Sequence, residues 1–319
     1  MLRDCDYIKT FDDIIFIVAG DYHPKDKIRA TPVFFPNENG DRVEKITGKR
    51  FIQKIEVHSK DLIAKLHPEY LPEASDLNSY GVLVPNQDII TYYAPRNKMK
   101  ECWDERILKG TKWEKLIISI KEIGQVPLED IGIYGSFLVG LNKGVSDLDL
   151  VLYGKENLNK VRKKLDLILK SSKIKKATDE QLLLRSNRWS KDKPIGINRI
   201  FKIEKRKWGR MNVYGEDTTC IRFVYKENEI PSNPITSSPI KEIRTKGKAL
   251  DSIGTHFRPR IAKVKINDKV FDIISYDWLF FSCVRDGDNV EIIGNYRKDG
   301  RREYITLDKP THYISPINF

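Results

Sequence analysis

The feature that most constrains the fold is the segment 131–154, which reads IGIYGSFLVGLNKGVSDLDLVLYG. Apolar residues at its start predict a strand, and Gly135-Ser136 predicts a sharp turn into a short helix. The Leu- and Val-rich end predicts a second strand. Asp147 and Asp149 are two residues apart in that strand, so we expect both side chains on the same face of a sheet.

The residue types in this segment indicate a particular chemistry. Two neighbouring carboxylates repel each other, and neither is cheap to bury without a positive partner. A divalent cation held between Asp147 and Asp149 resolves this conflict, and their oxygen ligands suit Mg²⁺. Gly135 allows the backbone to approach a phosphate closely, and Ser136 adds a hydroxyl donor beside the amides of a helix start. The alternative is an ordinary strand end whose aspartates are solvated.

The Gly-Ser turn, the spacer of about ten residues and the Asp-x-Asp pair in an apolar strand resemble the signature of the polymerase-beta-type nucleotidyltransferase superfamily. The resemblance implies an α+β fold whose central domain has a mixed sheet with helices. It implies that Gly135 and Ser136, with Ser146 beside the acids, hold the triphosphate of an NTP. Asp147 and Asp149 would ligate Mg²⁺ (or Mn²⁺), which aligns the attacking hydroxyl and neutralises charge on the α-phosphate.

The superfamily normally supplies a third acid from a later strand, and this chain departs from that pattern. The expected strand, 218–225, contains no carboxylate, and the position that aligns with the third acid is Cys220. Glu216 and Asp217 lie just before the strand. Three outcomes stay open: an active enzyme that uses Glu216 or Asp217, an enzyme with a third acid from elsewhere, or a domain that binds a nucleotide without transferring it.

A basic stretch follows the paired acids. Between residues 185 and 210 there are ten basic residues and two acidic ones. Aromatic side chains are interleaved with them: Trp189, Phe201 and Trp208. This pattern favours contact with a nucleotide or a nucleic acid, with Arg185 and Arg188 as candidate phosphate-binding residues. The alternative is an exposed basic helix whose aromatic residues anchor it to the core.

The net charge of +12 favours a polyanionic partner, either RNA or DNA or a phosphorylated substrate, although a lysine-rich composition gives the same charge without any partner. No apolar run approaches the ~20 residues that cross a bilayer, so we expect no membrane partner. The N-terminus lacks the apolar core of a secretory signal, and four scattered cysteines without CxxC spacing indicate reduced thiols. These features predict a cytoplasmic protein, and none of them sets an oligomeric state.

The length of 319 residues predicts two or three domains. We expect an N-terminal β-rich α+β unit over 1–110, a nucleotidyltransferase-like domain over 111–230, and an OB-like antiparallel barrel over 240–319. A linker rich in proline and serine, 228–239, joins the last two. Six short strands are predicted for the barrel, at 241–250, 260–266, 269–275, 279–282, 289–296 and 302–307.

Four arginines of the barrel are expected on its surface, where they would form a nucleic-acid face: Arg258, Arg260, Arg285 and Arg297. A barrel of this kind also serves as a plain packing module, which is the alternative. The domain order resembles a group of archaeal proteins, through HPKDKI at 23–28, HPEY at 67–70 and THFRP at 255–259. That resemblance implies an architecture and no substrate.

Two functions compete at this point. The first is a metal-dependent enzyme that transfers NMP from an NTP to an acceptor hydroxyl, with a nucleic-acid 3′ end as the favoured acceptor. The second is a non-catalytic nucleotide- or RNA-binding protein on the same fold, which has lost the third carboxylate.

Overall fold

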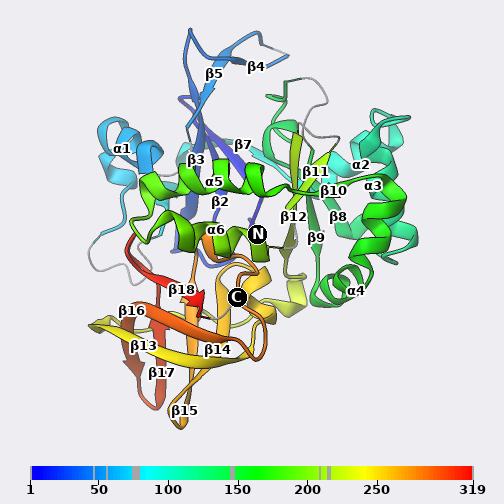
Figure 1. The fold of residues 1–319 in the computed structure, drawn as a ribbon. Coiled ribbons are helices and arrows are strands. Elements are labelled where there is room, and N and C mark those ends of the chain that lie inside the picture. The colour runs from blue at the N-terminus through cyan, green and yellow to red at the C-terminus, as the bar shows by residue number, and fades with distance from the viewer. Residues whose placement is uncertain are drawn as a thin grey trace. The chain divides into compact units, whose positions relative to one another are not determined.

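The computed structural model describes residues 2–45, 47–54, 57–73, 80–143, 148–207, 210–213 and 217–317, which form a mixed α+β fold (Figure 1). The chain folds into two compact units, each built from several segments. Unit 1 consists of Met1–Leu71, Gly81–Ala177 and Gly209–Ile230. Unit 2 consists of Pro72–Tyr80, Thr178–Trp208 and Pro231–Phe319.

The first part of unit 1 is a seven-stranded sheet in the order β4-β5-β3-β2-β1-β7, with β6 paired to β3. Its strands are β1 Tyr7–Thr10, β2 Ile15–Val18, β3 Lys27–Pro36, β4 Arg42–Val43, β5 Arg50–Gln53, β6 Val82–Pro85 and β7 Ile89–Tyr93. Helix α1 (Val57–Leu66) packs against β3 of this sheet, whereas α2 (Pro95–Asp104) packs against β8 (Ile131–Tyr134) of the second sheet. The β-rich character expected for this region is met by strands such as β2 and β3, which pair antiparallel. Phe16 of β2 and Ile63 of α1 are fully buried in the core of this sheet.

The second part of unit 1 is a five-stranded sheet in the order β10-β11-β12-β9-β8. Its strands are β8 Ile131–Tyr134, β9 Asp149–Tyr153, β10 Lys175–Lys176, β11 Arg210–Val213 and β12 Asp217–Val224. β8 runs antiparallel to β9, whereas β12 runs parallel to β9, so the sheet is mixed.

Two amphipathic helices, α3 (Lys112–Glu122) and α4 (Lys155–Ser172), accompany this mixed sheet and pack against each other (Figure 1). Both helices show the expected apolar spacing of three and four residues. Leu116 and Ile120 of α3 are fully buried, as are Leu158 and Val161 of α4. The long connection from β9 to its parallel neighbour β12 begins with helix α4 and continues through β10, two further helices and β11.

Unit 2 contains a closed barrel of five strands, β13-β14-β15-β17-β16, in which β13 also pairs with β16. The bounds are β13 Pro239–Asp251, β14 Arg260–Ile266, β15 Lys269–Ser275, β16 Asn289–Asp299 and β17 Arg302–Thr306. A sixth strand, β18 (Tyr313–Pro316), pairs with β16 outside the ring. Helices α5 (Asp179–Asp192) and α6 (Ile197–Arg206) contribute Trp189, Ile200 and Ile203 to the hydrophobic core of the barrel.

The sequence patterns located five of the six expected barrel strands, and the structure differs from the expectation in three respects. The expected strand at 279–282 is wrong, because a 3-10 turn occupies Trp278–Phe280 and the Asp277 carboxylate accepts the Leu279 amide at 2.8 Å. The expected antiparallel pairing is wrong for one pair, since β15 and β17 run parallel. Helices α5 and α6 were assigned to the central domain, and the structure groups them with the barrel core instead.

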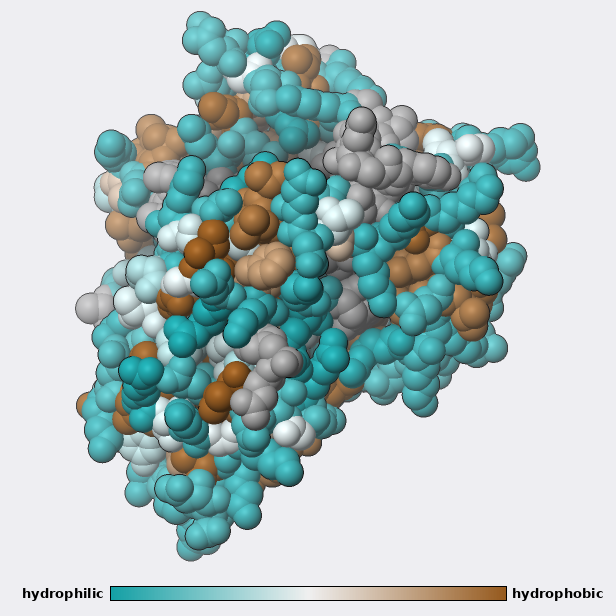
Figure 2. All heavy atoms as spheres, in the orientation of Figure 1, coloured by the Kyte–Doolittle hydropathy of each residue, from teal (hydrophilic) through white to brown (hydrophobic). Residues whose placement is uncertain are grey.

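The face of the molecule in view (Figure 2) is largely hydrophilic, and the cysteines are free thiols. Figure 2 shows hydrophilic residues over most of the face in view, with hydrophobic residues in small groups. Within the ranges that the structure describes, no helix is both long and apolar enough to cross a bilayer. All four cysteines are buried thiols outside any disulfide.

Candidate functional site

The Gly-Ser turn lies at the end of β8 and touches the start of β9. Gly135 has φ +77°, a conformation that favours glycine, and opens the 3-10 turn Gly135–Phe137. A Cβ at Gly135 would lie 3.0 Å from Oδ2 of Asp149, so only glycine lets that carboxylate approach the turn without displacement. The expected short helix after Ser136 is limited to this single 3-10 turn, because the Leu141 amide bonds back to the Ser136 carbonyl at 2.9 Å.

Asp149 is the first residue of β9 and is half-buried. Its Oδ1 atom accepts a hydrogen bond from the backbone amide of Cys220 at 3.1 Å. The parallel register pairs Ile221 with Leu150, which makes Cys220 the lateral neighbour of Asp149. The position expected for the third acid therefore lies beside Asp149, and its side chain is a thiol that is 5% exposed.

Among the side chains of β12 that the structure describes, the charged one near Asp149 is an arginine. Arg222 is half-buried, and its guanidinium carbon lies 4.5 Å from the centroid of the Tyr134 ring. Burial acts to lower the pKa of Arg222, but the nearby Tyr134, Cys220 and Asp149 outweigh it and raise that pKa well above its usual value. The guanidinium is therefore a fixed positive charge beside the Asp149 carboxylate.

Two tyrosines complete this cluster. Burial raises the pKa values of Tyr7, on β1, and Tyr134, on β8, and the charge of Asp149 adds to both shifts. The backbone of Gly135 hydrogen-bonds to Tyr7, so the glycine turn is anchored to the seven-stranded sheet. Tyr134 is only 2% exposed, yet its hydroxyl finds no hydrogen-bond partner within the described part of the chain. A buried orphan hydroxyl of this kind marks a place where a polar ligand would be stabilised.

The structure describes only some of the other residues predicted for this site. Ser136 is half-buried, and its hydroxyl makes no hydrogen bond to another described residue. Ser146, Asp147 and Glu216 lie outside the described residues. Asp217 begins β12, three residues before Cys220 along the strand, and its side chain is likewise not described. Within the described ranges, no group of three His, Cys, Asp or Glu residues is arranged to hold a metal ion.

Arg185 and Arg188 belong to α5 in unit 2. The Arg185 Nε atom lies 3.2 Å from Oε2 of Glu204, which is completely buried and also pairs with Lys207. Arg185 therefore balances an internal carboxylate, whereas Arg188 is exposed on the helix. Trp189 supports the alternative weighed for this basic stretch, since it anchors the helix in the barrel core.

The expected nucleic-acid face of the barrel is wrong for three of its four arginines. Arg258, Arg260 and Arg297 are 1%, 2% and 4% exposed, and only Arg285 lies at the surface. The Arg258 guanidinium carbon lies 3.6 Å from the centroid of the Trp278 ring. Sequence alone gave no warning of this, because the alternation of a strand does not reveal that an arginine has internal partners.

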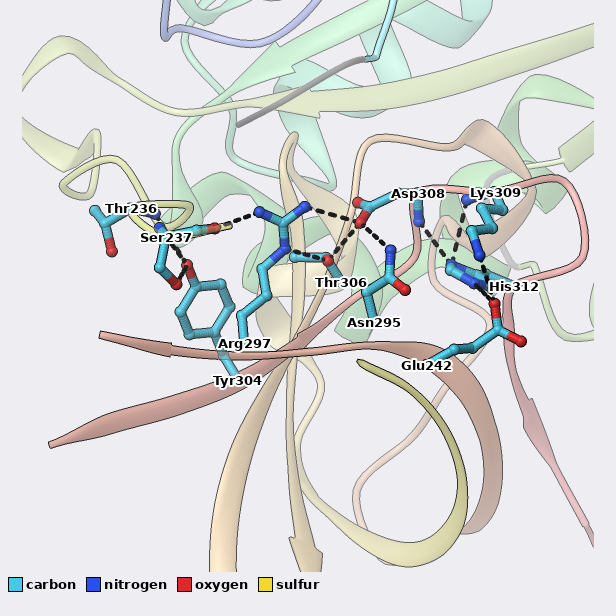
Figure 3. A network of polar contacts seen from close by, with 10 residues as sticks. All are labelled: Thr236, Ser237, Glu242, Asn295, Arg297, Tyr304, Thr306, Asp308, Lys309 and His312. Carbon is cyan, nitrogen blue, oxygen red and sulfur yellow. Dashed lines mark hydrogen bonds and ion pairs between the residues drawn. The ribbon is translucent and has the colours of Figure 1, made fainter. Parts of the chain in front are cut away.

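Figure 3 shows how one of these arginines is held inside unit 2. Arg297 donates from Nε to the Thr306 hydroxyl at 2.8 Å and from Nη2 to the Asp308 carboxylate at 3.0 Å, and its Nη1 bonds to the Ser237 carbonyl. The Tyr304 hydroxyl accepts the Ser237 amide at 3.0 Å. The segment expected to be a linker is thus fixed to the barrel at Ser237.

Sequence reasoning did not single out Arg222. The available signal was an arginine two residues after Cys220 in the apolar second half of the strand, which places both residues on one face. A positive charge here is conspicuous because it lies only two residues from Cys220, the position at which the resemblance leads to a carboxylate.

Comparison with known proteins adds little to this geometry. No family model matches the chain. A protein of Methanocaldococcus jannaschii, described as uncharacterized, is 27% identical over 219 residues, which are 66% of this chain and 64% of that protein. The chain thus matches less than two thirds of the length of that relative. The crystal structure of the tetrameric p202 HIN2 is similar over 34% of this chain and 61% of that chain, with 8% identity and a TM-score of 0.20, a level that carries no argument.

Proposed function

We propose that unit 1 contains a polymerase-beta-like nucleotidyltransferase domain, and that its Gly135 turn and Asp149 bind a nucleoside triphosphate together with a divalent cation. The observation that carries the proposal is the close approach of the Asp149 carboxylate to the positive-φ turn at Gly135. There, a backbone that can approach a phosphate and an oxygen ligand for a cation lie side by side. The mixed sheet, in which β9 has β8 antiparallel on one side and β12 parallel on the other, is consistent with this domain type.

The donor set fits one cation better than two. Mg²⁺ is commonly held by one or two carboxylates plus the phosphates of a nucleotide, and it keeps several waters. Asp149 supplies one such carboxylate, and the sequence places Asp147 two residues before it. When bound, the cation would neutralise charge on the triphosphate, and the orphan Tyr134 hydroxyl and the Ser136 hydroxyl offer further hydrogen bonds.

Binding, rather than transfer, is the function that the described residues support best. In-line displacement by two metals needs carboxylates that clamp both the attacking and the leaving oxygen. The neighbour of Asp149 on β12 is the Cys220 thiol, and the next side chain on that face is the Arg222 guanidinium. A positive charge at this position repels a second cation, whereas it attracts the phosphates of a nucleotide.

Transfer of NMP to an acceptor hydroxyl, with a nucleic-acid 3′ end as acceptor, is the second candidate. The observation in its favour is that two acids, Glu216 and Asp217, stand immediately before and at the first residue of β12. An acid at that point of the chain would supply a third ligand near Asp149.

For the barrel we propose an OB-type assignment. Support comes from its closed ring of five strands in a non-sequential order, in which β17 lies between β15 and β16.

Thermal unfolding with each NTP, with and without Mg²⁺, tests the binding proposal. We expect one or more NTPs to raise the Tm of the wild-type chain when Mg²⁺ is present, because a ligand that binds only the folded state stabilises it. Asp149→Asn should abolish this shift. The matched control is Asp166→Asn on α4, where an exposed carboxylate is neutralised in the same unit, and it should respond like the wild type. If no NTP raises the Tm of the wild-type chain, the proposal is wrong.

The second candidate has its own readout. Incubation with labelled NTP, Mn²⁺ and pooled RNA should give no incorporation if the site only binds. Incorporation by the wild type and by Asp166→Asn, but not by Asp149→Asn, would establish transfer instead.

A further inference from the structure

Unit 2 carries a cavity of about 580 Å³ outside the barrel ring, between the first turns of α6 and the strands β13, β16 and β18. Its lining combines cations with an apolar surface. The cations are Arg199, Lys202 and Lys246, and the apolar residues include Ile197, Pro316 and Ile317. Lys202 and Lys246 are exposed, so their ammonium groups are open to solvent.

Among the described residues, Glu291 is the carboxylate that lines this cavity, and its charge is already balanced. Glu291 accepts hydrogen bonds from Arg199 Nη2 at 3.0 Å, from Arg244 Nη2 at 2.6 Å and from the Tyr313 hydroxyl at 2.6 Å. The Arg199 guanidinium carbon also lies 4.2 Å from the centroid of the Tyr313 ring. Arg199 is therefore held in one orientation by an ion pair and a ring contact, with its charge kept at the cavity.

The electrostatic balance of the cavity is positive. Three lining cations face one lining carboxylate, and that carboxylate is shared with a fourth cation, Arg244. The first turn of α6 adds the positive end of its helix dipole to the same space. A ligand that suits this cavity has two or more negative charges and an apolar part that can lie on Ile197 and Ile317.

We propose that this cavity binds a short single-stranded segment of RNA or DNA, with its phosphates at Arg199, Lys202 and Lys246 and a sugar or base against the apolar residues. A concavity of this volume admits roughly one or two unpaired nucleotides, whereas a duplex would touch only its rim. An anionic membrane requires cations spread over an outward-facing surface, and here they surround a hollow. The net charge of +12 acts in the same direction by steering a polyanion toward the chain.

This surface differs from the barrel face that the sequence predicted. The predicted arginines, Arg258, Arg260 and Arg297, are internal, whereas Lys202 and Lys246 come from α6 and β13. The proposal concerns unit 2 alone and needs no nucleoside triphosphate. It therefore stands or falls separately from the site at Asp149.

Fluorescence anisotropy with a labelled single-stranded RNA 12-mer, and with the DNA of the same sequence, tests the proposal on the full chain without NTP. The variant Lys202→Gln/Lys246→Gln removes two lining cations. We expect its Kd to rise about 10-fold, and the slope of log K against log[salt] to become shallower by about 1.4, since a single-strand phosphate contact contributes ~0.7.

The matched control is Lys269→Gln/Lys298→Gln, which removes two exposed lysines of the barrel that do not line the cavity. Its Kd should stay within about 2-fold of the wild type, and melting curves verify that both variants are folded. If both variants weaken oligonucleotide binding equally, the loss is explained by net charge alone and the proposal is overturned. Unchanged oligonucleotide binding by the cavity variant would also overturn the proposal. This holds as well if that variant loses binding to phosphatidylserine vesicles or to a phosphopeptide, because the cavity would then have a different ligand.

Discussion

The substitution Gly135→Ala tests whether the glycine turn is shaped by its contact with Asp149. The residue combines two properties: φ is +77°, and a Cβ would lie 3.0 Å from the Asp149 Oδ2 atom. Gly140, five residues later, has only the first of these properties: its φ is +71°, and nothing lies within 4 Å of the Cβ position. Comparing the two alanine variants therefore isolates the contact from the backbone strain.

The magnitudes follow from these contacts. A left-handed conformation at a non-glycine residue costs roughly 1–2 kcal/mol, and this applies equally at Gly135 and Gly140. The loss of unfolded-state entropy on Gly→Ala, worth about 0.4–1 kcal/mol, also applies to both and cancels. At Gly135 alone, the carboxylate must shift and weaken its bond to the Cys220 amide, which as a charged hydrogen bond is worth roughly 1.5–3 kcal/mol.

The assay is thermal unfolding with and without NTP and Mg²⁺. A change of 1 kcal/mol moves Tm by about 2–4 °C in a folding unit of this size, so Gly135→Ala should melt roughly 3–12 °C below Gly140→Ala. Gly140→Ala should keep the nucleotide-dependent rise in Tm, and Gly135→Ala should lose it. Equal melting temperatures together with equal nucleotide responses would refute the reasoning, because the Asp149 contact would then have no influence on the turn.

Three further predictions concern other parts of the molecule. Cys220→Asp places a carboxylate beside Asp149, so repulsion between the two should lower the Tm in the absence of metal. Mn²⁺ should then raise the Tm of this variant more than it raises that of the wild type, and equal rises would count against a cation site. Burial raises the pKa of Asp6 from 3.8 to about 7, so its proton stabilises the fold below pH 4 and this stability is lost as the pH rises toward 7. Urea unfolding of Asp6→Asn should therefore show a flatter pH profile, with at most ~4 kcal/mol gained over the wild type at pH 8, and an unchanged profile would contradict the shift. Arg297→Met should destabilise unit 2 by about 3–5 kcal/mol in guanidinium unfolding, against ~0.5 kcal/mol or less for exposed Arg285→Met, and similar values for both would show that the buried network contributes little.

The sequence by itself determined the elements that depend on local patterns. Strands β13 to β17 were predicted from alternating apolar residues, with the 3-10 turn before β16 wrongly taken as a further strand. This works because the alternation that marks the buried face of a strand lies within the strand's own sequence. The three-and-four spacing located α3 and α4 in the same way. Gly135 was recognised as a turn residue because a positive φ is a property of one residue and its neighbours.

Only the tertiary structure decided which charges meet. The bond between Asp149 and the Cys220 amide joins residues 71 apart, and the Arg222 charge beside it depends on the register of two parallel strands. The same holds for Arg297, whose burial depends on Asp308 and on a carbonyl 60 residues away at Ser237. An arginine is compatible with either a surface or an interior, and only the partners that the fold brings to it select between them.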